Sequence, residues 1–284
     1  MSGSPRNGGA RERRVPLEVR DGTFAYGERV ISRHLDVEIP AGGFTVIVGP
    51  NACGKSTLLR GLAKLLKPGA GEVLLDGRDI HAHKPKEVAK KLGLLPQTSI
   101  APDGITVAEL VARGRHPHQS VFRQWSRRDE EAVATAMAAT RVTDLSGRLV
   151  DELSGGQRQR VWVAMALAQE TEILLLDEPT TFLDIAHQFE LLELLRDLNH
   201  QGRTLVAVLH DLNQACRYAT HVIAMADGQV VAQGAPHDVV TAELVHDVFG
   251  LPAHVLDDPI AGTPMVVPLG APGRVFDPAE HEPA

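Results

Sequence analysis

The chain has 284 residues, of which 43% are hydrophobic and 23% charged, and its formal net charge is −7 at pH 7. This length allows one large domain or two small ones with a sizeable core, and the composition is that of a soluble globular protein. The negative charge argues against broad electrostatic binding to nucleic acid or anionic lipid, so membrane attachment is expected only through a protein partner. No apolar run approaches the ~20 residues of a membrane-crossing helix.

Residues 1–14 are rich in Gly, Ser and Arg and contain no apolar stretch. This composition predicts a disordered tail and does not match a secretory signal. The two cysteines, Cys53 and Cys216, provide no disulfide framework. Cys53 lies in a glycine-rich loop where a disulfide would obstruct a ligand, so a reducing cytoplasm fits best.

Short strands alternate with helical segments along most of the chain. Helices are predicted over 55–66, 185–198 and 212–219, and strands over 15–20, 35–39, 44–48, 72–75, 92–95, 173–176, 204–209, 222–226 and 229–233. The run 44–48 is apolar throughout, as in a strand buried on both faces. The alternation predicts an α/β domain over about 15–250, with a largely parallel sheet covered on both faces.

Residues from about 100 to 165 differ from the rest of the chain in their pattern of predicted elements. Helices are predicted over 107–113 and 129–139 without a strand between them, which indicates a helical subdomain inserted into the α/β core. Its polar connector, 114–128, carries two aromatic residues that are expected to be exposed, Phe122 and Trp125, among basic residues. Residues 251–284 are predicted to be a C-terminal appendage that is partly disordered, and the chain contains no internal repeat.

The segment Gly49-Pro50-Asn51-Ala52-Cys53-Gly54-Lys55-Ser56 matches G-x-x-x-x-G-K-S between a predicted strand and a predicted helix. Such a loop directs backbone N–H groups and the positive end of a helix at phosphate oxygens. Lys55 would reach the β- and γ-phosphates of a nucleotide, and the Ser56 hydroxyl would ligate Mg²⁺. A chance glycine-rich turn is the alternative, and the flanking elements disfavour it. The loop and the next residue, Thr57, form a candidate nucleotide site.

Asp177 and Glu178 end the apolar run Leu174–Leu176, which puts two carboxylates at the carboxyl edge of the sheet, where open α/β folds bind ligands. Asp177 would hold Mg²⁺ through water, and Glu178 would polarise an attacking water. Consecutive carboxylates also occur in solvated turns, so this pair alone is weak evidence for a site. Together with the phosphate loop it indicates a nucleotide site.

The pentapeptide Leu153-Ser154-Gly155-Gly156-Gln157 precedes a helix predicted to run to about residue 168. Ser154 is a good N-cap and the glycines allow close approach to an anion, although a plain capped helix has the same features. Together with the two motifs above, this segment resembles the signature of the ATP-binding cassette family. The resemblance spans about 17–249. It implies a P-loop NTPase fold with a mostly parallel core sheet, an antiparallel β part and an inserted helical subdomain.

The resemblance implies roles for four further residues. Gln97 matches a glutamine that senses Mg²⁺ and connects to the helical subdomain, and Asp184 matches a loop that links two active sites. His210 matches a switch histidine that contacts the γ-phosphate. Tyr26 matches an aromatic residue that stacks on adenine, although the nearby Phe24 also offers a flat ring.

The resemblance also implies partners. Two copies would close head to tail on two ATP molecules, each held between Lys55 of one copy and Ser154 to Gln157 of the other. A groove near Gln97 and the 114–128 connector would grip an integral membrane permease, which in turn works with a substrate-binding protein. This places the chain at the cytoplasmic face of the membrane as a peripheral subunit, with no nucleic-acid partner.

Three stretches narrow the resemblance. Residues 111–119 (VARGRHPHQ), 181–188 (TFLDIAHQ) and 262–268 (GTPMVVP) look like the ATPase subunits of ferric-siderophore importers, a branch shared with haem and cobalamin importers. The commoner family wording at 181–184 is S-A-L-D. We therefore expect an ATPase that drives siderophore import, with haem or cobalamin import as the alternative.

Other classes fit less well. DNA-repair cassettes carry long insertions between the phosphate loop and the signature, and translation factors carry two cassettes. Iron–sulfur cluster assembly remains an alternative, although its ATPases lack the 181–188 wording. A module that senses ATP without hydrolysis would lack Glu178 or His210. The pairs His81/His83 and His116/His118 are expected to be surface residues and not metal ligands.

One residue departs from the family pattern: Ala52 stands where glycine is usual. If the backbone there needs a positive φ, alanine costs about 1–2 kcal/mol. Because backbone amides do the binding, function is expected to be intact.

Overall fold

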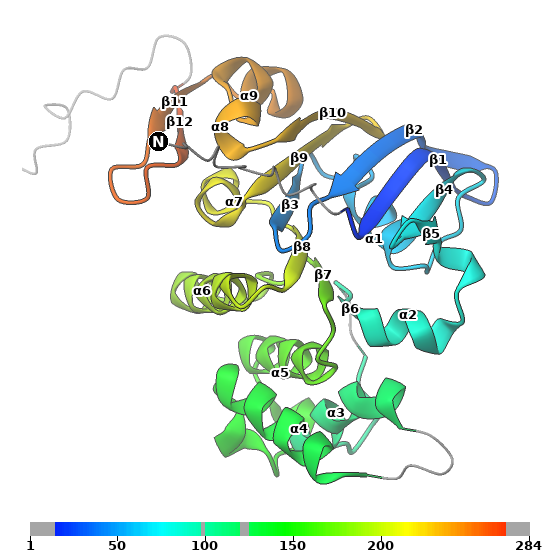
Figure 1. Ribbon diagram of the computed structural model, residues 1–284. Helices are drawn as coiled ribbons and strands as arrows, with labels where there is room; N and C mark the ends of the chain where they lie inside the picture. Colours follow the sequence, from blue (N-terminus) through cyan, green and yellow to red (C-terminus); the bar gives the residue numbers. More distant parts are fainter. Residues whose placement is uncertain (1–14, 98–99, 120–124, 271–284) are drawn as a thin grey trace, which may run out of the picture.

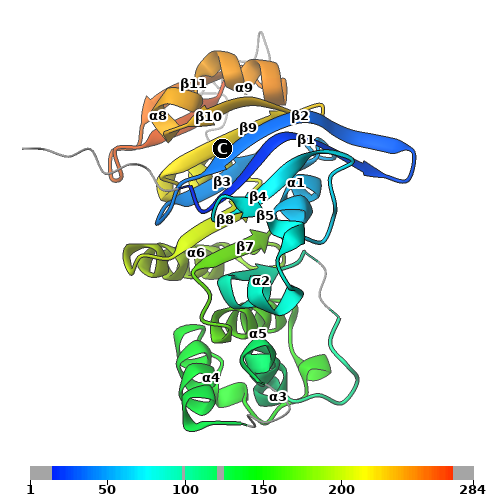
Figure 2. The same cartoon turned by 45° about the vertical axis from the view of Figure 1, so that its right-hand side comes forward.

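The computed structural model describes residues 15–97, 100–119 and 125–270. The predicted tail 1–14, Phe122 and the end of the appendage from residue 271 lie outside the described residues. Figures 1 and 2 show the sheets in the upper part of the molecule and a group of helices below them. Within the described ranges, no helix has the length and apolarity needed to cross a membrane.

A six-stranded sheet forms the centre of the molecule, in the order β10-β9-β3-β8-β7-β6. Strands β3, β6, β7, β8 and β9 are parallel, and β10 runs antiparallel to β9, which confirms the prediction of a mostly parallel core sheet. Every residue of β3, β7 and β8 is buried, as their continuous apolar runs predict. The bounds are β3 Phe44–Val48, β6 Leu92–Leu95, β7 Ile173–Asp177, β8 Thr204–Val208, β9 His221–Ala226 and β10 Gln229–Gly234.

Alternate side chains of the central strands enter two hydrophobic cores. In β3, Val46 and Val48 belong to one core, and Ile47 belongs to the other. The first core packs against α5 (Gly155–Ala168), α6 (Ile185–His200) and α7 (Leu212–Tyr218), and the second against α1 (Lys55–Leu62). Because successive side chains of a strand point to opposite faces, this sheet must be covered on both sides.

The antiparallel β part is a separate four-stranded sheet, β2-β1-β4-β5, made of β1 (Leu17–Tyr26), β2 (Arg29–Ile39), β4 (Ala70–Leu75) and β5 (Arg78–Asp79). Strands β1 and β2 are longer than the predicted 15–20 and 35–39. Their pairing shifts register between Val19 and Ala25, and Asp21 and His34 have positive φ. These bulges interrupt the alternation of polar and apolar residues, so the pattern did not predict the outer halves of the two strands.

The helices below the sheet are α3 (Val107–Ala112), α4 (Arg127–Ala139) and α5, which pack on one another. Short 3-10 helices cover Ile80–Ala82, Arg113–His118, Thr143–Leu145 and Val150–Glu152. Sequence patterns missed α2 (Pro85–Lys91), α8 (Pro236–Val239), α9 (Ala242–Phe249) and the hairpin of β11 (Ala253–Asp257) and β12 (Pro264–Pro268). In α2 only Val88 is buried, so no apolar periodicity marks it. Helix α1 ends at Leu62, four residues early, and Lys64 has a positive φ.

The connector after α3 has a buried charged residue near its start, Arg115, which its polar composition does not predict. Arg115 is 1% exposed. Its Nε donates to Asp129 Oδ1 at 2.9 Å, and its Nη1 donates to Glu170 Oε2 at 2.9 Å and to the carbonyl oxygen of Ala168 at 2.7 Å. The carboxylates of Asp129 and Glu170 and the carbonyl at the negative end of α5 offset the burial of this charge. Arg115 thereby joins the end of α5 to the start of α4.

Replacing Arg115 with Leu is expected to lower the free energy of unfolding by about 3–5 kcal/mol, because Asp129 would stay buried without its charged partner and keep only its hydrogen bonds from Ser126. The matched control is Arg127→Ala, whose ion pair with Glu131 is exposed and whose loss should change stability by less than about 1 kcal/mol. Urea unfolding of both variants checks this. Similar losses for the two would contradict a structural role for the buried arginine.

Candidate active site

The predicted phosphate loop connects β3 to α1. Gly49 has φ 150°, and a Cβ atom there would lie 2.2 Å from the Met225 carbonyl oxygen, so only glycine fits. Lys55 is 5% exposed, and its Nζ donates to the carbonyl oxygens of Gly49 at 2.8 Å and Pro50 at 2.7 Å. Of the remaining positions, Asn51 and Ala52 are exposed, whereas Cys53, Gly54 and Thr57 are buried. The lysine ammonium is therefore held beside the loop.

Ala52 has φ 63°, in the left-handed region that favours glycine. The condition under which alanine would be strained is thus met. The side chain is exposed, so the strain lies in the backbone and not in a steric conflict with neighbouring side chains.

Replacing Ala52 with Gly is expected to stabilise the chain by about 0.5–1 kcal/mol, because relief of the left-handed strain exceeds the entropy that glycine loses on folding. Nucleotide affinity should change little, since the loop keeps its backbone conformation. Denaturant unfolding and a nucleotide titration on the same samples measure the two effects. A destabilised variant would mean that the loop relaxes without its nucleotide.

Asp177 ends β7, and its side chain faces the start of α1. The Ser56 hydroxyl donates to Asp177 Oδ1 at 3.0 Å, and Asp177 is 3% exposed. Burial raises the pKa of Asp177 above its ordinary value, partly opposed by the hydrogen bond from Ser56, and the adjacent Glu178 raises it further. A bound cation would oppose that rise by favouring the ionised carboxylate.

Glu178 is where three loops meet. Gln97 Nε2, just after β6, donates to Glu178 Oε2 at 2.7 Å. His210 Nε2, just after β8, lies 2.8 Å from Glu178 Oε1. The Glu178 backbone has φ 52°, a conformation that few residues adopt without support from their surroundings. Three residues far apart in the sequence thus hold one another at the edge of the sheet.

Sequence reasoning missed two contacts to this loop. The Thr181 hydroxyl donates to Glu178 Oε2 at 3.3 Å, and Gln159 Nε2, from α5, donates to the Pro179 carbonyl oxygen at 3.0 Å. Thr181 lies in the stretch 181–188 and Gln159 lies two residues after the signature pentapeptide, but single polar residues carry no signal of which distant group they meet.

The signature segment begins α5. Ser154 is the N-cap: its Oγ accepts from the Gln157 backbone N–H at 3.3 Å, and Gln157 Oε1 accepts from the Ser154 N–H at 3.1 Å. This capping box fixes the helix start. The segment also adjoins the loop after Glu178, because Cβ atoms on Gly155 and Gly156 would lie 3.6 Å from Phe182 Cβ and 3.4 Å from Leu183 Cδ2.

Asp184 is the N-cap of α6. Its Oδ1 accepts from the His187 N–H at 2.9 Å, and hydrogen bonds to the His187 backbone and side chain lower the pKa of Asp184. The neighbouring Phe182 and Ile185 are 77% and 73% exposed. An exposed aromatic residue and an exposed aliphatic residue thus flank this carboxylate.

Of the two candidate stacking rings, only one is accessible. Phe24 is fully buried against Gly61, whereas Tyr26 is 42% exposed at the end of β1. The Tyr26 hydroxyl accepts from Arg60 Nη1 at 3.1 Å. Stacking on a ligand is therefore open to Tyr26 and closed to Phe24.

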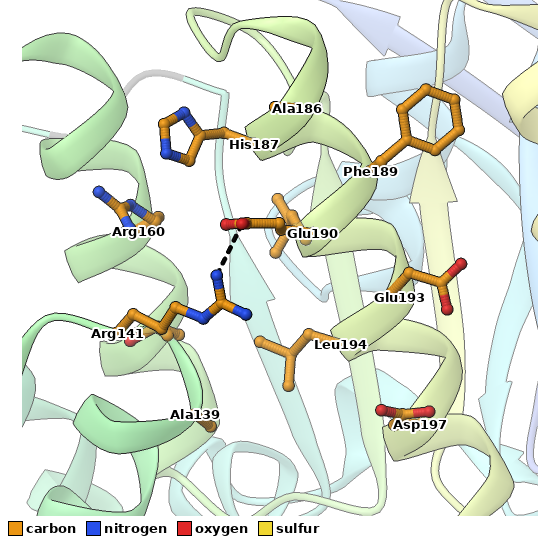
Figure 3. A pocket seen from close by; sticks show the side chains of 12 residues that line it. Ala139, Arg141, Arg160, Ala186, His187, Phe189, Glu190, Glu193, Leu194 and Asp197 are labelled. Carbon is orange, nitrogen blue, oxygen red and sulfur yellow. Dashed lines mark hydrogen bonds and ion pairs between the residues drawn. The ribbon is translucent and has the colours of Figure 1, made fainter.

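A cavity of about 440 Å³ lies between the end of α4, α5 and α6 (Figure 3). Arg141, whose Nη1 donates to Glu190 Oε1 at 2.6 Å, crosses it, with Arg160 and His187 nearby. The residues that line this cavity include none of the predicted nucleotide-binding or catalytic residues. Across the described chain, no group of three or more His, Cys, Asp or Glu side chains is placed to hold a metal ion.

Comparison with known proteins identifies the family. Residues 32–181 match the family model described as ABC transporter. The chain is 60% identical to the ferric enterobactin transport ATP-binding protein FepC of Escherichia coli (strain K12), over 87% of this chain and 92% of FepC. It is 54% identical to the probable siderophore transport system ATP-binding protein YusV of Bacillus subtilis (strain 168), over 87% of this chain and 90% of YusV.

A solved structure gives the same result for the fold. One chain from a transporter described as of the metal-chelate ABC type, in an inward-facing conformation, superposes with a TM-score of 0.77. The two chains are 29% identical, and the match covers 90% of this chain and 98% of the other.

Proposed function

The chain belongs to the ABC transporter family, and from this premise we propose that it is the ATP-hydrolysing subunit that energises import of a ferric siderophore through a membrane permease. Relatives named for enterobactin and siderophore transport support the cargo class. The observation that carries the proposal for hydrolysis is the contact of Gln97 and His210 with the two carboxylate oxygens of Glu178.

The nucleotide is assigned to the loop Gly49 to Thr57. Backbone N–H groups and the N-terminus of α1 suit phosphate oxygens, and Lys55 adds a positive charge at the β- and γ-phosphates. Tyr26 would stack on adenine, which its exposure favours.

Magnesium fits the groups present. The Ser56 hydroxyl and the Asp177 carboxylate lie 3.0 Å apart and are hard oxygen donors, which Mg²⁺ prefers, and Gln97 supplies an amide oxygen from the next loop. When bound with ATP, the ion would neutralise charge on the phosphates. These three residues include too few carboxylates to hold a metal ion by protein ligands alone. Mg²⁺ sites in which substrate phosphates also bind the ion need only one or two carboxylates.

Hydrolysis is assigned to Glu178. Its carboxylate would orient and polarise the water that attacks the γ-phosphate in line, while Lys55 stabilises the charge that develops. Gln97 and His210 each contact one oxygen of that carboxylate, so both would hold it in position, and His210 would also contact the γ-phosphate.

The second half of each site is assigned to another copy of the chain. The N-terminus of α5, with Ser154 to Gln157, would face the γ-phosphate bound by its partner, and Asp184 would link the two sites. The exposed Phe182 and Ile185 beside Asp184 give that partner an apolar surface to cover. The dimer would lie at the cytoplasmic face of the membrane, bound to permease subunits and through them to a substrate-binding protein.

Uptake of a radiolabelled ferric siderophore tests the proposal, in cells that lack this chain and receive either wild type or Glu178→Gln. Wild type is expected to restore uptake. The variant should bind ATP but hydrolyse it about 10²–10⁴-fold more slowly, because general-base assistance is lost, and should not restore uptake. Siderophore uptake that does not depend on the chain would redirect the cargo to haem or cobalamin, tested in the same strains.

Trp125 is 43% exposed at the end of the connector and is assigned to the permease contact. Replacing it with Ala is expected to weaken permease binding by about 2 kcal/mol, as for a tryptophan at the centre of an interface, while ATP binding by the isolated subunit is unchanged. Ile260→Ala, at an exposed residue of the C-terminal hairpin, is the control. Loss of ATP binding in the Trp125 variant would contradict this assignment. Phe122, the other connector aromatic, lies outside the described residues.

A further inference from the structure

The C-terminal hairpin is bonded to the helix that follows His210. Asn213, in the first turn of α7, accepts from the Val266 N–H through Oδ1 at 2.7 Å and donates through Nδ2 to the Val266 carbonyl oxygen at 3.2 Å. Its amide thus pairs with one residue of β12 as a neighbouring strand would. Val266 is 6% exposed and belongs to the first hydrophobic core. The first turn of α7 is therefore fixed to a buried point of the hairpin.

The next residue ties the same turn to the loop after β7. Gln214 Nε2 donates to Gln188 Oε1 at 2.8 Å. Gln188 Nε2 in turn donates to the carbonyl oxygens of Leu183 at 3.0 Å and Thr180 at 3.4 Å. Both ends of the Gln188 amide are used, one toward each side of the site.

His210 lies immediately before this turn. The Asp211 side chain caps α7 by accepting from the Gln214 N–H at 2.8 Å, so the backbone at residue 211 follows the position of the first helical turn. A catalytic contact loses effect when it moves by about 1 Å. The 2.8 Å contact between His210 and Glu178 therefore depends on where α7 begins.

We propose that Asn213, Gln214 and Gln188 are positioning residues, through which the C-terminal hairpin holds His210 in register with Glu178 and the loop 180–184. This inference rests on the proposed function, because it assigns the hairpin to the same ATPase site. The hairpin is then part of the catalytic unit and not a passive appendage.

The test uses full-length chains carrying Asn213→Leu or Gln214→Leu, which keep side-chain size but remove the hydrogen bonds. We expect kcat for ATP hydrolysis to fall about tenfold, while KM and ATP affinity stay within about twofold, since nucleotide contacts are untouched. His237→Leu is the matched control. It removes the contact of His237 Nε2 with the Gly262 carbonyl oxygen, which anchors the same hairpin to α8 and not to α7.

Two further variants separate positioning from general stability. Asn213→Asp keeps the acceptor for the Val266 N–H and should restore part of kcat. Gln188→Leu combined with Gln214→Leu should lose little more than Gln214→Leu alone, because both break one chain of bonds. Thermal unfolding of every variant is measured alongside kcat. If Asn213→Leu does not fold, the kcat values of Gln214→Leu and Asn213→Asp decide whether the positioning role holds.

Equal effects of Asn213→Leu and His237→Leu on kcat would overturn the inference. A kcat unchanged from wild type in folded Asn213→Leu and Gln214→Leu would overturn it as well. In both cases an active wild type leaves the proposed function standing. A folded wild-type chain without ATPase activity would refute the proposed function and the inference together.

Discussion

The site depends on one constraint, which is the order of four parallel strands. Strands β3, β8, β7 and β6 are adjacent in that order, and their carboxyl ends meet along one edge. The phosphate loop follows β3, His210 follows β8, Asp177 and Glu178 end or follow β7, and Gln97 follows β6. Because adjacent parallel strands end at the same edge, the strand order places these groups side by side. This is the edge at which open α/β sheets bind ligands.

Several loop residues around that edge have strained backbone conformations that neighbouring contacts stabilise. Ala52, Glu178 and Phe182 are non-glycine residues with positive φ, each in a loop next to the nucleotide site or the proposed dimer surface. Such conformations cost about 1–3 kcal/mol and persist where surrounding contacts determine them. For Glu178 the contacts come from Gln97, His210 and Thr181, so the conformation of this loop is determined by its neighbours and not by its own preference.

The helical part is joined to this edge through α5, which follows the signature at its start and accepts a hydrogen bond from Arg115 at its end. Arg115 bonds the last turn of α5 to α4, and Gln159 bonds the first half of α5 to the loop after Glu178. Helix α5 is therefore bonded at one end to α4 through Arg115 and near the other end to the loop that carries the carboxylate. The C-terminal hairpin is fixed to α7 in the same manner, through side-chain amides.

The sequence by itself determined the local elements and the chemical groups: a strand, glycine-rich loop and helix from residue 44 on, two carboxylates at the end of an apolar strand, and a capped helix at Ser154. These follow from periodicity, capping and turn chemistry, which act between residues close in the chain. Only the tertiary structure decided that Arg115 is buried, that Phe24 is closed to a ligand while Tyr26 is open, and that Asn213 pairs with Val266. Such contacts join residues far apart in the chain, and they are set by strand order and packing, which leave no local pattern.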